Sequence, residues 1–214
     1  MDTQTPKWRA AVIEYIRREA RPVDKFGHQP RLYSLTRSIG EKLGSEKPGD
    51  EEIPYDDDVV FAAAWMHDLG VFAGHRPEDP IALTSWDNVA YAIERVPAVL
   101  TGFGFSAEKI PAVIEAIRTH QPHQYPQSIE ATILRDADIL EQLGAVGILR
   151  AVAKVGRDTR YATFSDIVPT LRKASETLPP LLRLEPAKAL AEQRVQVLKD
   201  FLTAVDAEAG TDLF

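Results

Sequence analysis

A histidine and an aspartate stand side by side at the end of an apolar segment. The segment covers residues 61–66, His67 and Asp68 follow it, and Gly70 comes next. An imidazole nitrogen and a carboxylate oxygen are common ligands of divalent metal ions. A histidine is also frequent in the last turn of an ordinary helix, and an isolated His-Asp pair favours that simpler interpretation. The apolar segment and the glycine make a buried pair of metal ligands an equal alternative.

The chain contains five histidines, and all of them lie between positions 28 and 123. His28 precedes Arg31 by three residues, which places both on one face of a helix. The pair is either a metal ligand beside a cation for an anionic substrate, or a solvent-exposed helix start. His120 is a candidate for a substrate contact, an outer residue of a metal site or an exposed residue. We expect His75 and His123 to be exposed.

Two further acids, Asp136 and Asp138, interrupt an apolar pattern over residues 133–141. A carboxylate within an apolar helix is costly unless it is paired or binds a metal ion. The alternative is a surface carboxylate, or one that pairs with the nearby Arg135.

The elements that must position these residues are helices. Apolar residues recur at helical spacing, and no stretch alternates as a strand would. We expect Asp56–Asp58, Ser85, Ser128 and Ser165 to start helices and Pro97 to kink or restart one. The first two predicted helices end at about residues 20 and 43. The later ones cover about 59–67, 86–102, 106–120, 128–143, 145–155 and 165–178, and a long helix begins at about residue 186. The fold class is all-α, as a single domain over residues 1–214.

Composition limits the function. The chain of 214 residues is 44% hydrophobic and 27% charged, carries a net charge of −7 and has no cysteine. The absence of cysteine excludes disulfides, thiolate ligands and a cysteine nucleophile. The negative charge argues against a nucleic-acid polymer as partner, although a bound cation can still attract a small anion.

No apolar run is long enough for a membrane span, and the N-terminus lacks the pattern of a secretory signal. We expect a cytoplasmic protein.

The order of these motifs resembles the HD-domain superfamily of metal-dependent phosphohydrolases, and most closely its small stand-alone bacterial members. The resemblance rests on His28-x-x-Arg31, on His67-Asp68 and on the segment that contains Asp138. That segment reads Asp-Ala-Asp-Ile-Leu-Glu-Gln-Leu-Gly-Ala-Val-Gly-Ile over residues 136–148, and an Ile-x-x-His segment ends before it at His120. The resemblance covers about residues 26–155, the metal-site core. The helices over about 165–209 are compatible with it.

The resemblance implies an HD-type helical bundle and a metal ion held by His28, His67, Asp68 and Asp138. Two imidazoles and two carboxylates suit Mn, Fe, Co, Ni or Zn, among which the sequence does not choose. Asp68 would also orient a water molecule, and His120 is the second candidate catalytic residue. Arg31 is the candidate for substrate binding.

One position departs from the family pattern. Some relatives carry a glutamate three residues after the aspartate of the His-Asp pair, where this chain has Val71. The departure puts a dedicated general base at that position in doubt. Asp136 is a possible substitute, or a partner that orients a ligand.

The resemblance predicts a metal-dependent phosphohydrolase that acts on a nucleotide or another small phosphate ester or anhydride. Two alternatives remain open at this point. Some HD-fold proteins are hydratases of small nitrile-like compounds, although Arg31 and Arg135 favour an anionic substrate. A non-catalytic binding module that keeps the metal site is the other. The sequence does not indicate the oligomeric state of the protein.

Overall fold

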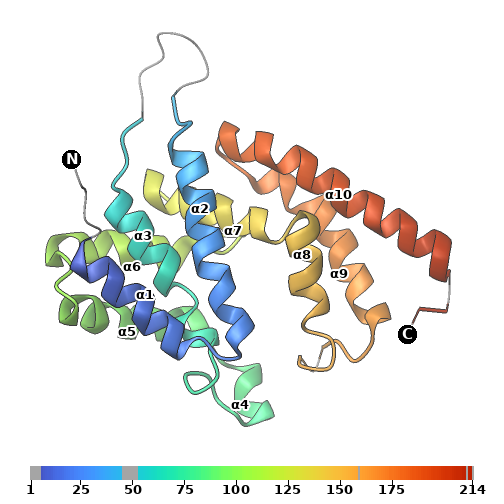
Figure 1. Ribbon diagram of the computed structural model, residues 1–214, viewed down its shortest axis with the longest axis horizontal. Coiled ribbons are helices and arrows are strands. Elements are labelled where there is room, and N and C mark those ends of the chain that lie inside the picture. The colour runs from blue at the N-terminus through green and yellow to red at the C-terminus, as the bar shows by residue number, and fades with distance from the viewer. Residues whose placement is uncertain (1–5, 45–52, 159, 211, 214) are drawn as a thin grey trace. The chain divides into compact units, whose positions relative to one another are not determined.

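A computed structural model describes residues 6–44, 53–158, 160–210 and 212–213 (Figure 1). Helices dominate this part of the chain and none of it forms a β-strand, so the all-α prediction is confirmed. None of the helices in the described residues combines the length and apolar character of a membrane span. The helices are α1 (Lys7–Glu19), α2 (His28–Gly40), α3 (Asp57–Met66), α4 (Pro80–Thr84), α5 (Asn88–Gly102), α6 (Ile110–Thr119), α7 (Ile129–Glu141), α8 (Gly144–Val152), α9 (Phe164–Thr177) and α10 (Glu185–Ala209).

Contacts within the chain divide it into two compact units, residues 1–135 and 136–214. The boundary between them falls inside α7. The sequence predicts one domain over the whole chain, and that statement stays a prediction.

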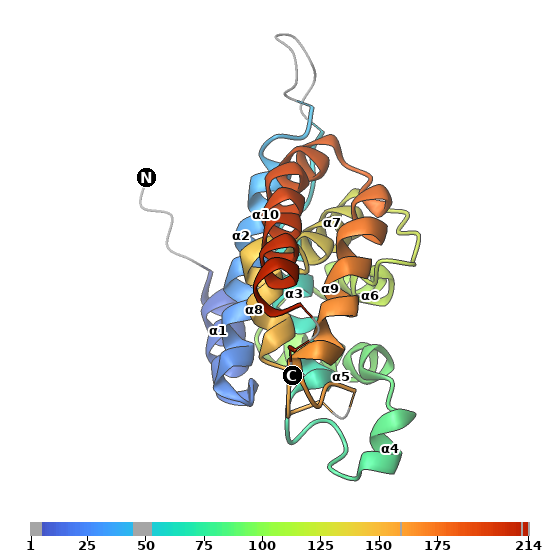
Figure 2. The same ribbon diagram turned by 90° about the vertical axis from the view of Figure 1, so that its right-hand side faces the viewer.

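The first unit is built around α3. Residues 59–66 of this helix are all buried, and α1, α2, α5 and α6 pack against it (Figure 1). A helix that is apolar on every side is stable only inside a protein, which explains why four helices cover it. Both views show the short helix α4 projecting from this unit (Figures 1 and 2), and none of its residues is buried.

The second unit contains α8, α9 and α10, each in contact with the other two (Figure 2). Leu198 and Leu202 of α10 are buried, as are Ile167 and Leu171 of α9. The apolar spacing in both helices therefore marks the sides on which the unit is packed.

Several helix boundaries differ from the sequence prediction, and three of them are instructive. Asp87, not Ser85, caps α5, because its side chain accepts hydrogen bonds from two backbone N–H groups of the first turn. Thr163, not Ser165, caps α9, where it forms a reciprocal pair with Asp166. The predicted second helix ends at Gly40 rather than near residue 43.

Two other differences concern whole segments. Helix α5 continues through Pro97, so it does not restart there, and the alternative of a kink stays a prediction. Its residues Ala92, Val96 and Leu100 are buried along one side. The free energy gained by burying that side outweighs the loss of the backbone hydrogen bond that proline cannot donate. Helix α4 was not predicted at all. The sequence also predicts a helix cap at Thr5, which lies outside the described residues, and an exposed polar loop over residues 45–54, of which only 53 and 54 are described.

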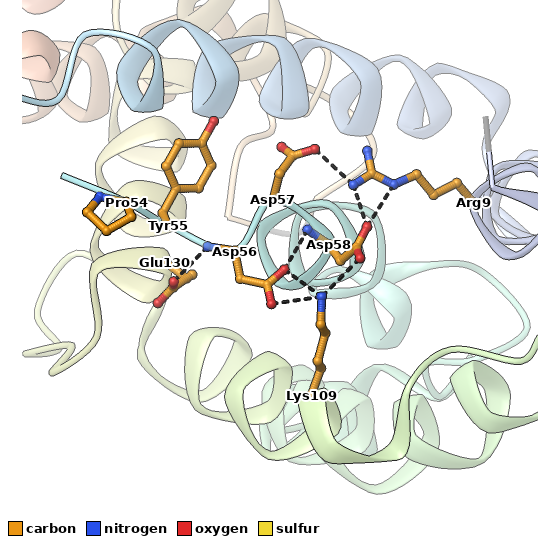
Figure 3. A pocket seen from close by; sticks show the side chains of 8 residues that line it. All are labelled: Arg9, Pro54, Tyr55, Asp56, Asp57, Asp58, Lys109 and Glu130. Carbon is orange, nitrogen blue, oxygen red and sulfur yellow. Dashed lines mark hydrogen bonds and ion pairs between the residues drawn. The ribbon is translucent and has the colours of Figure 1, made fainter. Parts of the chain in front are cut away.

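Charged side chains fix the first turn of α3 (Figure 3). The carboxylate of Asp56 accepts hydrogen bonds from the N–H groups of Asp58 and Val59 and caps the helix. The guanidinium of Arg9 lies 2.8 Å from Asp57 and 2.6 Å from Asp58. The ammonium of Lys109 lies 2.8 Å from Asp56 and 3.0 Å from Asp58. Figure 3 shows both cations directed at the aspartates, so α1 and the segment before α6 are attached to the same helix end.

A pocket of about 580 Å³ opens at this end of α3 (Figure 3). Helix α3 has ten residues, so at 1.5 Å per residue the pocket lies about 15 Å from the end that carries His67. The cations in its wall are already bound to its carboxylates. We therefore assign these charges to anchoring α3. The pocket is lined by Arg9, Pro54, Tyr55, Asp56, Asp57, Asp58, Lys109 and Glu130.

Replacing Asp56 by alanine is expected to lower the free energy of unfolding by about 1 kcal/mol, because the first turn of α3 loses its cap. Urea denaturation followed by circular dichroism measures the change. Asp79→Ala is the matched control, since Asp79 caps α4 in the same way but that helix buries none of its residues. Equal losses in the two variants would contradict the anchoring role of Asp56.

Asp58 should make the protein less stable in acid. Burial raises the pKa of Asp58, but the hydrogen bonds from Arg9 and Lys109 outweigh it and hold the pKa below its usual value. A lowered pKa in the folded state contributes stability above the unfolded pKa of about 3.9, and this stability is lost as the pH falls through the folded value.

The variant Asp58→Asn is therefore expected to be less stable than the parent by at most about 1 kcal/mol at pH 7, because its ion pairs are partly exposed. The difference should shrink below about pH 4, where the parent loses the charge as well. Urea denaturation at a series of pH values measures it. Glu14→Gln, at an exposed ion pair with Arg17, should follow the parent throughout. A deficit for Asp58→Asn that is independent of pH would refute the electrostatic explanation.

Candidate metal centre

The C-terminal end of α3 delivers His67 and Asp68. The backbone N–H of His67 still bonds to the carbonyl of Ala63, so His67 closes the helix. Asp68 follows with φ −92° and ψ 11°, in the sparsely populated bridge region where many active-site residues lie. A 3₁₀ turn over Leu69–Val71 then carries the chain away. His67 is 1% exposed, whereas the side chain of Asp68 keeps 19% of its surface.

One hydrogen bond fixes the tautomer of His67. Its Nδ1 lies 3.0 Å from the carbonyl oxygen of Ala64. A carbonyl can only accept, so Nδ1 carries the hydrogen and a neutral ring presents a lone pair at Nε2. Metal-binding histidines characteristically donate their other ring N–H to a carbonyl or carboxylate. His67 therefore has the arrangement expected of a ligand that binds through Nε2.

His28 is the first residue of α2 and is 4% exposed. Its Nε2 lies 3.4 Å from Nε2 of His67 and 3.7 Å from Oδ2 of Asp68. Nε2 of His67 lies 3.5 Å from Oδ1 of Asp68. Two nitrogens that bind one ion at about 2.1 Å stand about 3.0 to 3.4 Å apart for ligand angles of about 90° to 110°. The two imidazoles are thus spaced to bind one divalent ion, and a different carboxylate oxygen of Asp68 lies near each of them.

His120 lies beside this group. Its ring meets the ring of His67 edge to face, with centroids 4.9 Å apart, and it is 5% exposed. Its Nδ1 lies 2.7 Å from the carbonyl oxygen of Ile117, so this nitrogen also carries a hydrogen. Nε2 of His120 is therefore a proton acceptor when the ring is neutral and a donor when it is charged.

Arg31 is exposed on α2, one turn after His28. Its guanidinium folds back toward the start of the helix, because a Cβ atom added at Gly27 would meet Nη1 of Arg31 at 2.9 Å. The predicted arrangement of His28 and Arg31 on one side of the helix is thus present. What the guanidinium binds stays a prediction.

Asp138 belongs to the second unit. It lies in the last turn of α7 and is half-buried, and the side-chain amide of Gln142 donates to its Oδ2 at 3.3 Å and to its carbonyl at 3.2 Å. Its role as a ligand stays a prediction from the resemblance.

Asp136 has a different task from the one that the sequence left open for it. Its carboxylate is fully buried and accepts hydrogen bonds from the backbone N–H groups of Arg183 and Leu184, at 2.9 and 2.8 Å. Leu184 directly precedes α10. Asp136 therefore fixes the start of that helix, and this burial and bonding disfavour it as the substitute for a general base.

His75 contradicts the prediction that it is exposed, whereas His123 is exposed as predicted. The side chain of His75 keeps 13% of its surface. Its Nδ1 lies 2.9 Å from the hydroxyl of Tyr91 and its Nε2 lies 3.1 Å from the carboxylate of Glu19. Burial raises the pKa of Glu19, but the hydrogen bonds from Arg18 and His75 lower it further than burial raises it.

Comparison with known proteins identifies the family. A family model for the HD domain matches residues 26–143, more than half of the chain. This chain belongs to the HD-domain family. The resemblance seen in the sequence is thus confirmed. HD domains bind divalent metal ions, which agrees with the close approach of His28 and His67. No curated protein matches the chain.

Several solved structures share the fold of this chain. YpgQ from Bacillus subtilis is 23% identical, with a TM-score of 0.71 over 96% of this chain and 97% of YpgQ. The same protein in complex with ADP gives a TM-score of 0.70 over 96% of each chain, again at 23% identity. An HD-superfamily hydrolase from Bacillus thuringiensis is 20% identical, with a TM-score of 0.65 over 96% of this chain and 97% of that protein. At these identities the likeness is one of fold.

Substitution of His28 or His67 by alanine is expected to abolish binding of one equivalent of Mn²⁺ or Zn²⁺, because each removes a buried ligand atom. Metal content after dialysis, measured by inductively coupled plasma spectrometry, tests this. His123→Ala is the control, since His123 is exposed. A full equivalent of metal in the His67→Ala variant would refute the centre.

Proposed function

We propose that this HD-domain protein is a metal-dependent phosphohydrolase that acts on a nucleotide or another small phosphate ester or anhydride. The observation that supports it most directly is the convergence of His28, His67 and Asp68, with His120 against His67. We propose Asp138 as the fourth ligand, from the family resemblance. The ion is Mn, Fe, Co, Ni or Zn, in keeping with nitrogen and oxygen ligands alone.

When bound, such an ion lowers the pKa of a water molecule and polarises a phosphoryl oxygen. The chain's own residues supply the rest. Asp68 keeps part of its carboxylate surface accessible, so it can accept a hydrogen bond from the attacking water. His120 can accept a proton at Nε2 when neutral, and as the imidazolium it can give that proton to the leaving oxygen.

The missing glutamate narrows the choice of general base. Val71 has no proton to exchange, and Asp136 is held by the backbone before α10. In our proposal the task falls to Asp68 or to His120, which are the two catalytic candidates of the sequence analysis.

Arg31 supports a phosphate rather than a neutral substrate. A guanidinium can form two parallel hydrogen bonds to phosphate oxygens, and Arg31 lies one turn from the ligand His28. Hydration of a small nitrile needs no such cation, so Arg31 disfavours that alternative. The complex of YpgQ with ADP supports the nucleotide class, which we extend to this chain as part of the proposal. The cytoplasmic location stays a prediction from the sequence.

Turnover decides the reaction class. The full chain, loaded in turn with Mn²⁺, Co²⁺, Ni²⁺, Zn²⁺ or Mg²⁺, is offered nucleoside mono-, di- and triphosphates and small nitriles. We expect release of phosphate or pyrophosphate that a chelator stops and that His67→Ala reduces by at least about 100-fold. Hydration of a nitrile without hydrolysis of any phosphate compound would establish the alternative. Metal binding without turnover of either class would leave a non-catalytic module.

Arg31→Ala is expected to lower kcat/KM for the phosphate substrate by about 10-fold or more, the loss typical of a charge-assisted hydrogen bond. Arg37→Ala is the matched control, because Arg37 is an exposed arginine of the same helix that pairs with Glu41. Steady-state kinetics compares the two. Equal kcat/KM values for both variants and the parent would exclude Arg31 from substrate binding.

A further inference from the structure

The segment that follows Asp68 is held in place on both sides. Leu69, Gly70 and Phe72 are buried, and the N–H of Val71 donates to the carbonyl of Asp68 at 2.9 Å. The backbone of Asp68 is thus itself part of the 3₁₀ turn. Whatever fixes this turn also fixes the direction in which the Asp68 side chain leaves the backbone.

Trp86 fixes the turn from the side of α5. Its indole N–H donates to the carbonyl oxygen of Gly70 at 2.8 Å. The backbone of Asn88, the first residue of α5, presses against the same glycine, since a Cβ atom at Gly70 would lie 2.5 Å from the carbonyl oxygen of Asn88. Residues 86–88 therefore hold Gly70 by a hydrogen bond and by close contact, two residues after Asp68.

His75 provides a second attachment further along the segment. Its two ring nitrogens join the hydroxyl of Tyr91 on α5 to the carboxylate of Glu19 at the end of α1. The rings of Trp86 and Tyr91 lie in contact, with centroids 5.2 Å apart. Each attachment therefore uses one ring of this aromatic pair, which lies at the start of α5.

The need for these attachments follows from the position of Asp68, just beyond the end of α3. A buried backbone carbonyl such as that of Gly70 also needs a hydrogen-bond partner. We propose that Trp86, with His75 as a second anchor, is a positioning residue that holds the Asp68 carboxylate within reach of His28 and His67. The inference rests on the proposed metal centre.

The test compares two tryptophan variants of the full chain. Trp86→Phe keeps an aromatic ring and removes the N–H that holds Gly70. Trp8→Phe makes the same change in the same unit, at a ring that packs edge to face against Phe61 and Phe105. Calorimetric titration of the metal-free proteins with Mn²⁺ measures affinity, and the visible absorption of bound Co²⁺ reports ligand geometry. Urea denaturation of the metal-free proteins measures stability separately.

We expect Trp86→Phe to bind Mn²⁺ about 10-fold more weakly, as removal of groups that orient ligands does, and to shift the Co²⁺ spectrum. Trp8→Phe should match the parent in both. Tyr91→Phe, which removes the hydroxyl bonded to His75, should also weaken Mn²⁺ binding. If Trp86→Phe does not fold, the Mn²⁺ affinity of Tyr91→Phe tests the positioning role instead. A loss of stability with unchanged Mn²⁺ affinity and Co²⁺ spectrum in both variants would overturn the positioning role.

His67→Ala separates this inference from the function on which it rests. If His67→Ala binds Mn²⁺ as the parent does, the proposed metal centre is wrong, and the positioning role fails with it. If His67→Ala loses Mn²⁺ while Trp86→Phe and Tyr91→Phe bind it like the parent, the centre stands and only the positioning role is wrong.

Discussion

The burial of residues 59–66 of α3 is the constraint on which the first unit depends. Eight consecutive residues, 59–66, are apolar and hidden on every side. At about 0.8 kcal/mol for each buried CH₂ group, no single neighbouring helix could compensate for exposing the other sides. Four helices must therefore surround α3, and this crowding leaves its two ends as the places for polar groups. The N-terminal end takes the aspartates with Arg9 and Lys109, and the C-terminal end takes His67 and Asp68.

The sequence predicts features that depend on residues close together in the chain, and it misses those that depend on contacts between distant residues. The all-α class, the position of α3 and the pairing of His67 with Asp68 rest on local spacing, and so they were accessible. The cap of α5 was not, because Ser85 and Asp87 are both good caps and only the packed helix decides between them. Pro97 left a kink and a restart both open for the same reason, since the continuation of α5 depends on the burial of one side and not on a local preference alone.

The residues of the candidate site divide in the same way, into those that local spacing predicts and those that depend on distant partners. His28 and Asp138 could be connected with His67 only through the family pattern, because no local rule joins residues so far apart. The environment of His75 was out of reach, since its partners Glu19 and Tyr91 lie 56 and 16 residues away. The two acids of the 136–138 segment look equivalent in the sequence. Their roles separate only when Arg183 and Leu184, from a distant part of the chain, present their N–H groups to Asp136.

The orientation of α3 has an electrostatic consequence that does not depend on any side chain. The aligned peptide dipoles of a helix place about half a positive charge at its N-terminus and about half a negative charge at its C-terminus. In α3 the positive end faces Asp56, Asp57 and Asp58, while the negative end lies where His67 and Asp68 follow. The backbone itself thus favours a cation at the candidate centre, by about 0.3 to 1 kcal/mol for a charge close to the last turn. Exchange of a ligand side chain leaves that field in place, so the preference for positive charge is a property of the fold as well as of the ligands.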